Sequence, residues 1–195
     1  MRIVGGEYRG RRLATPAGDA IRPTSDRYRE TLFNMLGHRA GFVLDGARVL
    51  DLFSGTGALG LEALSRGARF CLFVEESTEG RGLIRQNVET FGLQGRSRIF
   101  RRDATRLGPS GAVEPFDLLL ADPPYGKRLG EAALASALAG GWLKPGAVVV
   151  LEEAATAPFD VPPGLRLEEA RAMGETVLRF LVADANAADG DLTKP

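Results

Sequence analysis

Four acidic residues come at or near the ends of four apolar segments that have the character of buried β-strands. They are Asp51, Glu75, Asp103 and Asp122. In an open α/β sheet, ligands bind at the carboxyl ends of the parallel strands, where the strand order reverses. A role as ordinary turn residues would explain any one of these acids, but it explains all four poorly. The sequence therefore predicts that the four carboxylates belong to one ligand site.

A glycine-rich segment follows Asp51. Gly55, Gly57 and Gly60 fit the pattern G-x-G-x-x-G, which permits a tight turn and lets a ligand approach the backbone. Many nucleotide-binding folds share that spacing. A carboxylate four residues before Gly55 would repel a pyrophosphate but would attract the ammonium of an amino acid. Because S-adenosyl-L-methionine is a nucleoside that carries an amino acid, we interpret the loop as its site. A plain strand–turn–helix with a capping acid is the alternative.

Two further acids suit the nucleoside part of that cofactor. Glu75 lies 20 residues after Gly55, where a carboxylate can accept hydrogen bonds from both ribose hydroxyls. Asp103 ends the third strand segment, where it can accept a hydrogen bond from the exocyclic amine of adenine. The backbone N–H of Ala104 can serve a ring nitrogen.

The segment Asp122-Pro123-Pro124-Tyr125 is the candidate reactive element. An exocyclic base amine is a poor nucleophile because its lone pair is delocalised into the ring. The Asp122 carboxylate and the Pro123 carbonyl would accept hydrogen bonds from its two N–H groups. This would favour a more pyramidal nitrogen and stabilise the positive charge that grows on it. The prolines stiffen the turn, and Tyr125 offers a face on which a splayed base can stack. A simple turn is the alternative.

The remaining patterns predict an α/β fold. Apolar strand segments alternate with amphipathic helices, which is typical of a parallel sheet covered on both faces. After a first strand in 49–53, we expect strands in 69–74, 97–101, 116–121 and 147–152, and helices in 25–38, 59–66, 80–91 and 132–143. The runs 165–172 and 176–183 have no room for a helix between them, so they should pair antiparallel. Residues 2–15 are predicted to form two short strands around a Gly-rich turn.

Charge is balanced overall but uneven along the chain. The 195 residues carry 25 basic and 25 acidic side chains, yet residues 1–40 have a net charge of +4 and residues 151–195 one of −5. The basic end, with Arg9, Arg11 and Arg12, is the candidate contact for a polyanion. A solvated surface is an equally simple explanation of a modest excess.

The cysteine and histidine content limits which disulfides and metal sites the chain can form. Cys71, the single cysteine, lies in an apolar run and is predicted to be a core residue; it excludes an internal disulfide and fits a reducing compartment. With one His and one Cys, we expect no metal site. No window approaches the roughly 20 apolar residues of a membrane helix, so we expect a cytoplasmic protein.

These motifs together resemble a known family. VLDLFSGTGALGLEAL, VEE, RDA and ADPPY are similar to the successive motifs of class I S-adenosylmethionine-dependent methyltransferases that modify exocyclic amines. The segments RIVGGEYRGRRL and IRPTSDRYRETLFNML resemble the start of the bacterial RsmD family, whose members methylate N2 of a guanine in 16S ribosomal RNA. The likeness covers residues 1–183 and implies that activity. It also implies a single Rossmann-like domain with a seven-stranded, mostly parallel sheet, in which the antiparallel C-terminal hairpin inserts its last strand between the fifth and sixth.

The resemblance also implies roles for individual residues. It assigns to the cofactor a set of ten residues: Asp51, Phe53, Ser54, Gly55, Thr56, Gly57, Glu75, Asp103, Ala104 and Asp122. The catalytic set would be Asp122, Pro123 and Tyr125. The substrate set, which combines the resemblance with the basic N-terminus, is Arg9, Arg11, Arg12, Arg22, Thr24, Pro124 and Tyr125.

We expect three parts in the chain: an RNA-contacting extension in 1–45 built of a β-hairpin and a helix, the methyltransferase domain in 46–183, and a disordered acidic tail in 184–195. The expected partner is 16S rRNA within a small-subunit assembly intermediate that includes ribosomal proteins. Three alternatives stay open. A DNA adenine-N6 methyltransferase would use the same Asp122-Pro123-Pro124-Tyr125 chemistry but usually carries a separate target-recognition region. A nucleotide-dependent oxidoreductase leaves Asp51 and this segment unexplained, and a non-catalytic RNA-binding module leaves the intact segment unexplained.

Overall fold

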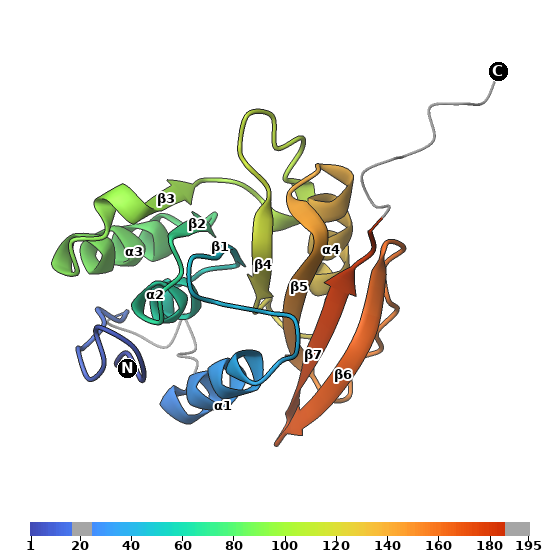
Figure 1. Cartoon of the computed structure of the whole chain (residues 1–195), viewed down its shortest axis with the longest axis horizontal. Helices are drawn as coiled ribbons and strands as arrows, with labels where there is room; N and C mark the ends of the chain where they lie inside the picture. The colour runs from blue at the N-terminus through green and yellow to red at the C-terminus, as the bar shows by residue number, and fades with distance from the viewer. Residues whose placement is uncertain (17–24, 186–195) are drawn as a thin grey trace.

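The computed structural model describes residues 1–16 and 25–185, in which helices cover both faces of one seven-stranded sheet (Figure 1). The strands are β1 (Arg48–Leu52), β2 (Phe70–Val74), β3 (Ser97–Phe100), β4 (Phe116–Ala121), β5 (Leu143–Ala154), β6 (Leu165–Met173) and β7 (Thr176–Ala183). The helices are α1 (Asp26–Gly37), α2 (Ala58–Ser65), α3 (Thr78–Thr90) and α4 (Leu129–Ala139), with short 3-10 turns η1 (Gln94–Arg96) and η2 (Ala104–Arg106). Arg22, Thr24 and most of the expected tail lie outside the described residues.

The strand order is β3-β2-β1-β4-β5-β7-β6. The first five strands are parallel, and β7 runs antiparallel between β5 and β6, so the expected insertion of the last strand is confirmed. β6 and β7 pair antiparallel because their connection is short and turns at Gly174, which has φ of +67°. The order reverses between β1 and β4, which is the switch point of the sheet.

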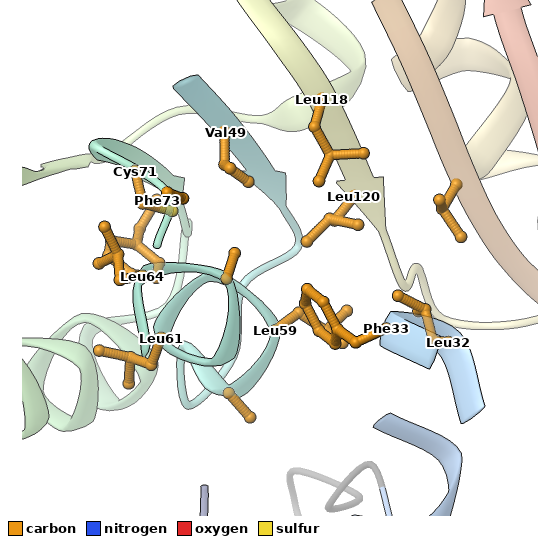
Figure 2. Close-up of a cluster of buried hydrophobic side chains, with 14 of the residues drawn as sticks. Leu32, Phe33, Val49, Leu59, Leu61, Leu64, Cys71, Phe73, Leu118 and Leu120 are labelled. Atoms are coloured by element: carbon orange, nitrogen blue, oxygen red, sulfur yellow. The ribbon is translucent and has the colours of Figure 1, made fainter. Parts of the chain in front are cut away.

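Alternate residues of the central strands supply two separate cores. Val49, Leu118 and Leu120 face α1, α2 and α3, where they pack with Phe33 and Leu61 (Figure 2). The intervening strand residues face the opposite side and pack against α4 and η2. Strands buried on both faces explain why the sequence shows continuous apolar runs rather than alternation. Cys71 is fully buried in the first core, as expected.

The N-terminal segment differs from its expected form. Residues 2–15 do not form two strands; their arms meet at a single bridge between Arg2 and Arg12. Backbone hydrogen bonds still join the arms, as from Ile3 N to Arg11 O at 3.0 Å. The segment also bonds to side chains of α2: Val4 N donates to Glu62 Oε2 at 2.9 Å, and Tyr8 N donates to Ser65 Oγ at 2.9 Å. It is therefore folded on itself and fixed on α2.

The region after α4 also differs from its expected form. The helix spans Leu129–Ala139 rather than 132–143, because the chain reverses at Gly141 with φ of +71°. Trp142 then turns inward and its indole N–H donates to Gly108 O at 2.7 Å. β5 begins immediately afterwards at Leu143, opposite Phe116 of β4, and is longer than expected. These contacts all join residues far apart in the chain.

Candidate active site

A large cavity opens at the carboxyl ends of the central strands. Its volume is about 1350 Å³. Ligand pockets usually span roughly 300–1,000 Å³, so this one can hold a nucleoside cofactor together with a base. The cavity lies at the switch point between β1 and β4, and all four strand-end acids, Asp51, Glu75, Asp103 and Asp122, line it.

The glycine loop places the buried carboxyl of Asp51. The backbone N–H of Gly60, in the first turn of α2, donates to Asp51 Oδ2 at 3.0 Å. A β-carbon on Gly60 would lie 2.9 Å from that oxygen and 2.5 Å from Cys71 Sγ, so only glycine fits there. Gly57 has φ of +79° and Phe53, unusually for a bulky residue, has φ of +56°. Strained backbone of this kind occurs mainly at functional sites.

The environment of Asp51 changes its titration. Burial raises the pKa of Asp51 to about 8, the neighbouring Asp122 and Glu75 raise it as well, and the Gly60 hydrogen bond opposes them. The side chain is 1% exposed. An ammonium ion placed beside this carboxyl would favour its charged form. The site therefore fits the amino group of the expected cofactor.

Glu75 is held by two backbone donors. Its Oε2 accepts a hydrogen bond from Gly55 N at 2.8 Å, and its Oε1 accepts one from Ser77 N at 2.8 Å. Gly80 allows this placement, because a β-carbon there would lie 2.8 Å from Glu75 Cγ. An ionised carboxylate has about four lone-pair sites, so two acceptor positions are left for a ribose diol.

Asp103 caps the short turn η2. Its Oδ1 accepts hydrogen bonds from Thr105 N at 2.8 Å and from Thr105 Oγ1 at 2.7 Å. These two bonds lower the pKa of Asp103, so the group is an ionised acceptor at neutral pH. Asp103 and the buried Ala104 both line the cavity. The arrangement suits the edge of an adenine ring.

The loop after β4 is fixed from the neighbouring strand β5. The hydroxyl of Tyr125 donates to Glu152 Oε1 at 2.7 Å, and Gly126 N donates to Glu153 Oε1 at 3.1 Å. Pro123 is buried and Pro124 is exposed, and both line the cavity together with Asp122. These hydrogen bonds to β5 therefore fix the positions of Asp122 and the Tyr125 ring at the cavity.

The sequence analysis missed several residues that line the cavity, among them Glu152 and Tyr28. Glu152 of β5 is 6% exposed, and Tyr28 of α1 is 7% exposed. The sequence could have indicated Glu152 as a site residue, because it is a fifth acid at the end of an apolar strand segment. Tyr28 gave no such signal, because it follows the apolar spacing of its helix and has the pattern of a packing residue. The tip of the β6–β7 hairpin, with Met173 and Thr176, also lines the cavity.

The three arginines of the predicted substrate set that the structure describes, Arg9, Arg11 and Arg12, lie outside the cavity lining. All three are exposed, and Arg11 is also held in place. Its guanidinium lies 4.5 Å from the centre of the Phe91 ring and donates to Thr90 O at 2.9 Å. The role of these side chains in binding RNA stays a prediction.

The end of this segment is tied to the glycine loop. Asn87 of α3 accepts a hydrogen bond from Ala14 N at 2.7 Å and donates to Thr56 O at 3.2 Å. The carboxamide thus joins the N-terminal segment directly to a residue of the predicted cofactor site.

The comparisons with known proteins identify the family. The family model described as "Conserved hypothetical protein 95" matches residues 1–182. Ribosomal RNA small subunit methyltransferase D of Escherichia coli strain K12 is 34% identical over 194 residues, which cover 98% of this chain and 94% of that protein. The protein of the same name from Haemophilus influenzae is 31% identical over 176 residues, or 89% of each chain.

This chain belongs to the RsmD family. The solved structure of yhhF from Escherichia coli is 32% identical and covers 95% of this chain and 98% of its own, with a TM-score of 0.81. The RsmD sheet is thus the Rossmann-like methyltransferase fold that the motifs predicted. An RsmD chain implies a methyl donor of the S-adenosylmethionine type, and the carboxylates described above fit one.

Two further observations concern membranes and metals. Within residues 1–16 and 25–185, no helix of this RsmD chain has the length and apolar character needed to cross a membrane. In the same residues, no cluster of three or more His, Cys, Asp or Glu side chains is arranged to hold a metal ion.

Proposed function

We propose that this protein transfers a methyl group from S-adenosyl-L-methionine to the exocyclic N2 amine of a guanine in 16S ribosomal RNA. The observation that carries this proposal is the position of Asp122-Pro123 at the end of β4. These two residues line the same cavity as Asp51 and the glycine loop, which lie across the switch point of the sheet. A donor and an acceptor of the methyl group can therefore meet there.

Three groups would bind the cofactor. The Asp51 carboxylate would pair with its ammonium, and Glu75 would accept hydrogen bonds from both ribose hydroxyls while its own backbone donors hold it in place. Asp103 and the N–H of Ala104 would bind the adenine edge. S-adenosyl-L-methionine supplies an electrophilic methyl group on its sulfonium.

The loop after β4 would prepare the nucleophile. The Asp122 carboxylate and the Pro123 carbonyl would accept hydrogen bonds from the two N–H groups of the guanine N2 amine and orient its lone pair toward the methyl group. Positive charge develops on that nitrogen during attack, and fixed acceptors stabilise it without reorganising. The Tyr125 ring, held by Glu152, would stack on the base.

Several features support an RNA substrate in the small ribosomal subunit. The relatives from Escherichia coli and Haemophilus influenzae are named for that RNA. The N-terminal region has a net charge of +4, which would attract phosphates, but this is a small excess for a protein that binds RNA alone. We therefore propose an assembly intermediate with ribosomal proteins as the substrate, in the cytoplasm, with residues 1–45 as the RNA-contacting part.

The test is methyl transfer from labelled cofactor to naked 16S RNA and to small-subunit assembly intermediates, followed by nucleoside analysis. We expect N2-methylguanosine, formed faster on the intermediates. Label in adenine N6 of DNA, or no transfer to either RNA, would contradict the proposal.

Variants of Asp122 test the chemistry separately from binding. Asp122→Ala should fold, bind the cofactor and methylate RNA at least about 100-fold more slowly in single-turnover assays, because the lost interaction strengthens in the transition state. Asp122→Asn keeps an acceptor oxygen and should retain more activity. Asp117→Asn is the matched control; Asp117 lies at the other end of β4 and pairs with Lys144 at 2.8 Å. An Asp122→Ala rate equal to that of the parent would rule out this site for the reaction.

A further inference from the structure

Glu152 is a buried carboxylate that the proposed reaction uses only to hold Tyr125. It lies near the end of β5, is 6% exposed and lines the cavity. Its Oε1 accepts the Tyr125 hydrogen bond at 2.7 Å, but its buried Oε2 has no hydrogen-bond partner. Among the described residues, no lysine or arginine forms a salt bridge with it.

A buried carboxylate oxygen without a hydrogen-bond donor destabilises the protein when no ligand is bound. Leaving a buried polar group unsatisfied costs about 1–3 kcal/mol, and more for a charged group. Asp51 and Asp122 line the same cavity, so the surroundings are already acidic. A ligand that donates a hydrogen bond to Glu152 Oε2 would remove the cost.

Tyr28 presents the complementary group beside it. Its hydroxyl is buried and lies beside Glu152, but it makes no hydrogen bond of good geometry to any described residue. Burial raises the pKa of this hydroxyl well above its usual value, and the charge and hydrogen bonding of the adjacent Glu152, together with the charge of Asp122, raise it further. The Tyr28 hydroxyl is therefore a proton donor at any physiological pH, next to an unsatisfied acceptor.

The cavity thus combines one donor with two acceptors, and this combination matches one base. The Watson–Crick edge of guanine carries the O6 acceptor, the N1–H donor and the N2 amine donor side by side. Adenine carries an acceptor at N1, whose lone pair would face the Glu152 carboxylate. Enzymes that act on a flipped base read this edge through hydrogen bonds.

We propose that Glu152 and Tyr28 select guanine as the target base. Glu152 Oε2 accepts the N1–H of the base, and the Tyr28 hydroxyl donates to O6. Asp122 then receives the N2 amine, and Tyr125 holds Glu152 in orientation. This inference rests on the proposed guanine-N2 methylation and assigns its base specificity to α1 and β5.

A base analogue separates recognition from chemistry. 2-Aminopurine keeps the amine that accepts the methyl group, but its N1 has no hydrogen and it lacks O6. The substrate RNA, reconstituted into the assembly intermediate, would carry either guanine or 2-aminopurine at the position that nucleoside analysis identifies. Single-turnover methylation of the two RNAs gives a guanine preference for each protein.

The parent should prefer guanine by at least about 100-fold, since sites built to bond a donor strongly reject analogues that lack it. In Glu152→Gln the Tyr125 hydroxyl donates to the amide oxygen, which therefore takes the place of Oε1. The amide NH2 then takes the place of Oε2, faces the base and can donate to N1 of 2-aminopurine. The preference should fall at least about 100-fold. Tyr28→Phe should slow guanine methylation at least about tenfold and leave 2-aminopurine methylation unchanged.

Glu153→Gln is the matched control. Glu153 is the buried neighbour of Glu152 on β5 but is absent from the cavity lining and accepts from Gly126 N and Ala154 N. It should keep the guanine preference of the parent. Calorimetry with S-adenosyl-L-methionine verifies that each variant is folded, and Tyr28→Phe carries the test alone if Glu152→Gln does not fold.

The outcomes distinguish the two proposals. If the parent forms N2-methylguanosine while Glu152→Gln and Tyr28→Phe keep its full guanine preference, the base-selection inference is wrong and the proposed function stands. If the parent forms no N2-methylguanosine on any small-subunit substrate, the proposed function itself fails.

Discussion

The Asp51 carboxyl accepts a hydrogen bond from the backbone N–H of Gly60 at 3.0 Å, and this contact joins the central strand to the helix that follows the glycine loop. It brings a titratable group into a site that water hardly reaches, since Asp51 is 1% exposed. The same contact allows no side chain at Gly60. Two predictions follow from these properties.

The first prediction concerns stability and pH. The pKa of Asp51 is about 8 in the folded protein, raised by burial, and about 3.9 in an unfolded chain. Between these values the folded state binds a proton that the unfolded state lacks, so stability falls as pH rises through this window. The asparagine side chain of the Asp51→Asn variant does not titrate, so the variant lacks this contribution to the pH dependence of stability. The free energy of unfolding of the parent should therefore fall relative to that of the variant, by up to about 1.4 kcal/mol per pH unit between pH 5 and 8.

Urea denaturation at a series of pH values measures this difference. Asp117→Asn is the control: burial raises the pKa of Asp117, but hydrogen bonds from Lys144 and Arg48 outweigh it and lower the pKa overall. Its titration lies below the tested range, so its effect on stability should not vary between pH 5 and 8. Parallel pH profiles for the parent and Asp51→Asn would show that Asp51 is ionised in the folded state.

The second prediction concerns Gly60. A β-carbon there would lie 2.4 Å from Phe73 Cε1 and 2.5 Å from Cys71 Sγ, both in the packed core. Gly60→Ala should lower the free energy of unfolding by about 1–3 kcal/mol through overpacking. Gly82→Ala is the control, because Gly82 lies within α3 and has no atom within 4 Å of the added carbon. It should be neutral or stabilise by up to about 1 kcal/mol. Equal effects of the two substitutions would contradict the close approach at Gly60.

The third prediction concerns Glu75 and cofactor affinity. Each charge-assisted hydrogen bond to ribose contributes roughly 1.5–3 kcal/mol. Glu75→Ala should therefore weaken S-adenosyl-L-methionine binding at least about tenfold, as measured by calorimetry. Part of the loss would come from breaking the hydrogen bonds that Gly55 N and Ser77 N donate to Glu75. Glu75→Gln would keep part of this bonding, because its amide oxygen still accepts. Glu79→Gln in the exposed first turn of α3 is the control. An unchanged affinity in folded Glu75→Ala would remove Glu75 from the cofactor site.

The fourth prediction concerns RNA binding by the N-terminal segment. Arg9 and Arg12 are exposed, so a double Ala variant should fold normally and lower the salt dependence of RNA binding by about two phosphate contacts. Arg11 is tested separately, because its stacking on Phe91 makes it a structural residue as well. Arg98→Ala with Arg166→Ala removes the same charge from exposed positions on β3 and β6. If both double variants change the salt slope equally, the RNA surface is not specific to the N-terminus.

The sequence alone determined the local elements and the chemistry at their ends. β4 and β7 have their predicted bounds, and the four acids at or near the strand ends line one cavity. These features depend on short-range patterns: apolar runs define strands, and parallel strands bring their ends to one edge. The place of β7 between β5 and β6, by contrast, came from the family resemblance.

Only the tertiary structure decided which distant residues complete the site. Tyr28 and Glu152 are 124 positions apart in the sequence, and their meeting depends on how α1 packs against the sheet. The anchoring of Val4 on Glu62 depends likewise on a contact between remote segments. No local pattern encodes them, because the free energy of such contacts arises only once the sheet has brought the segments together.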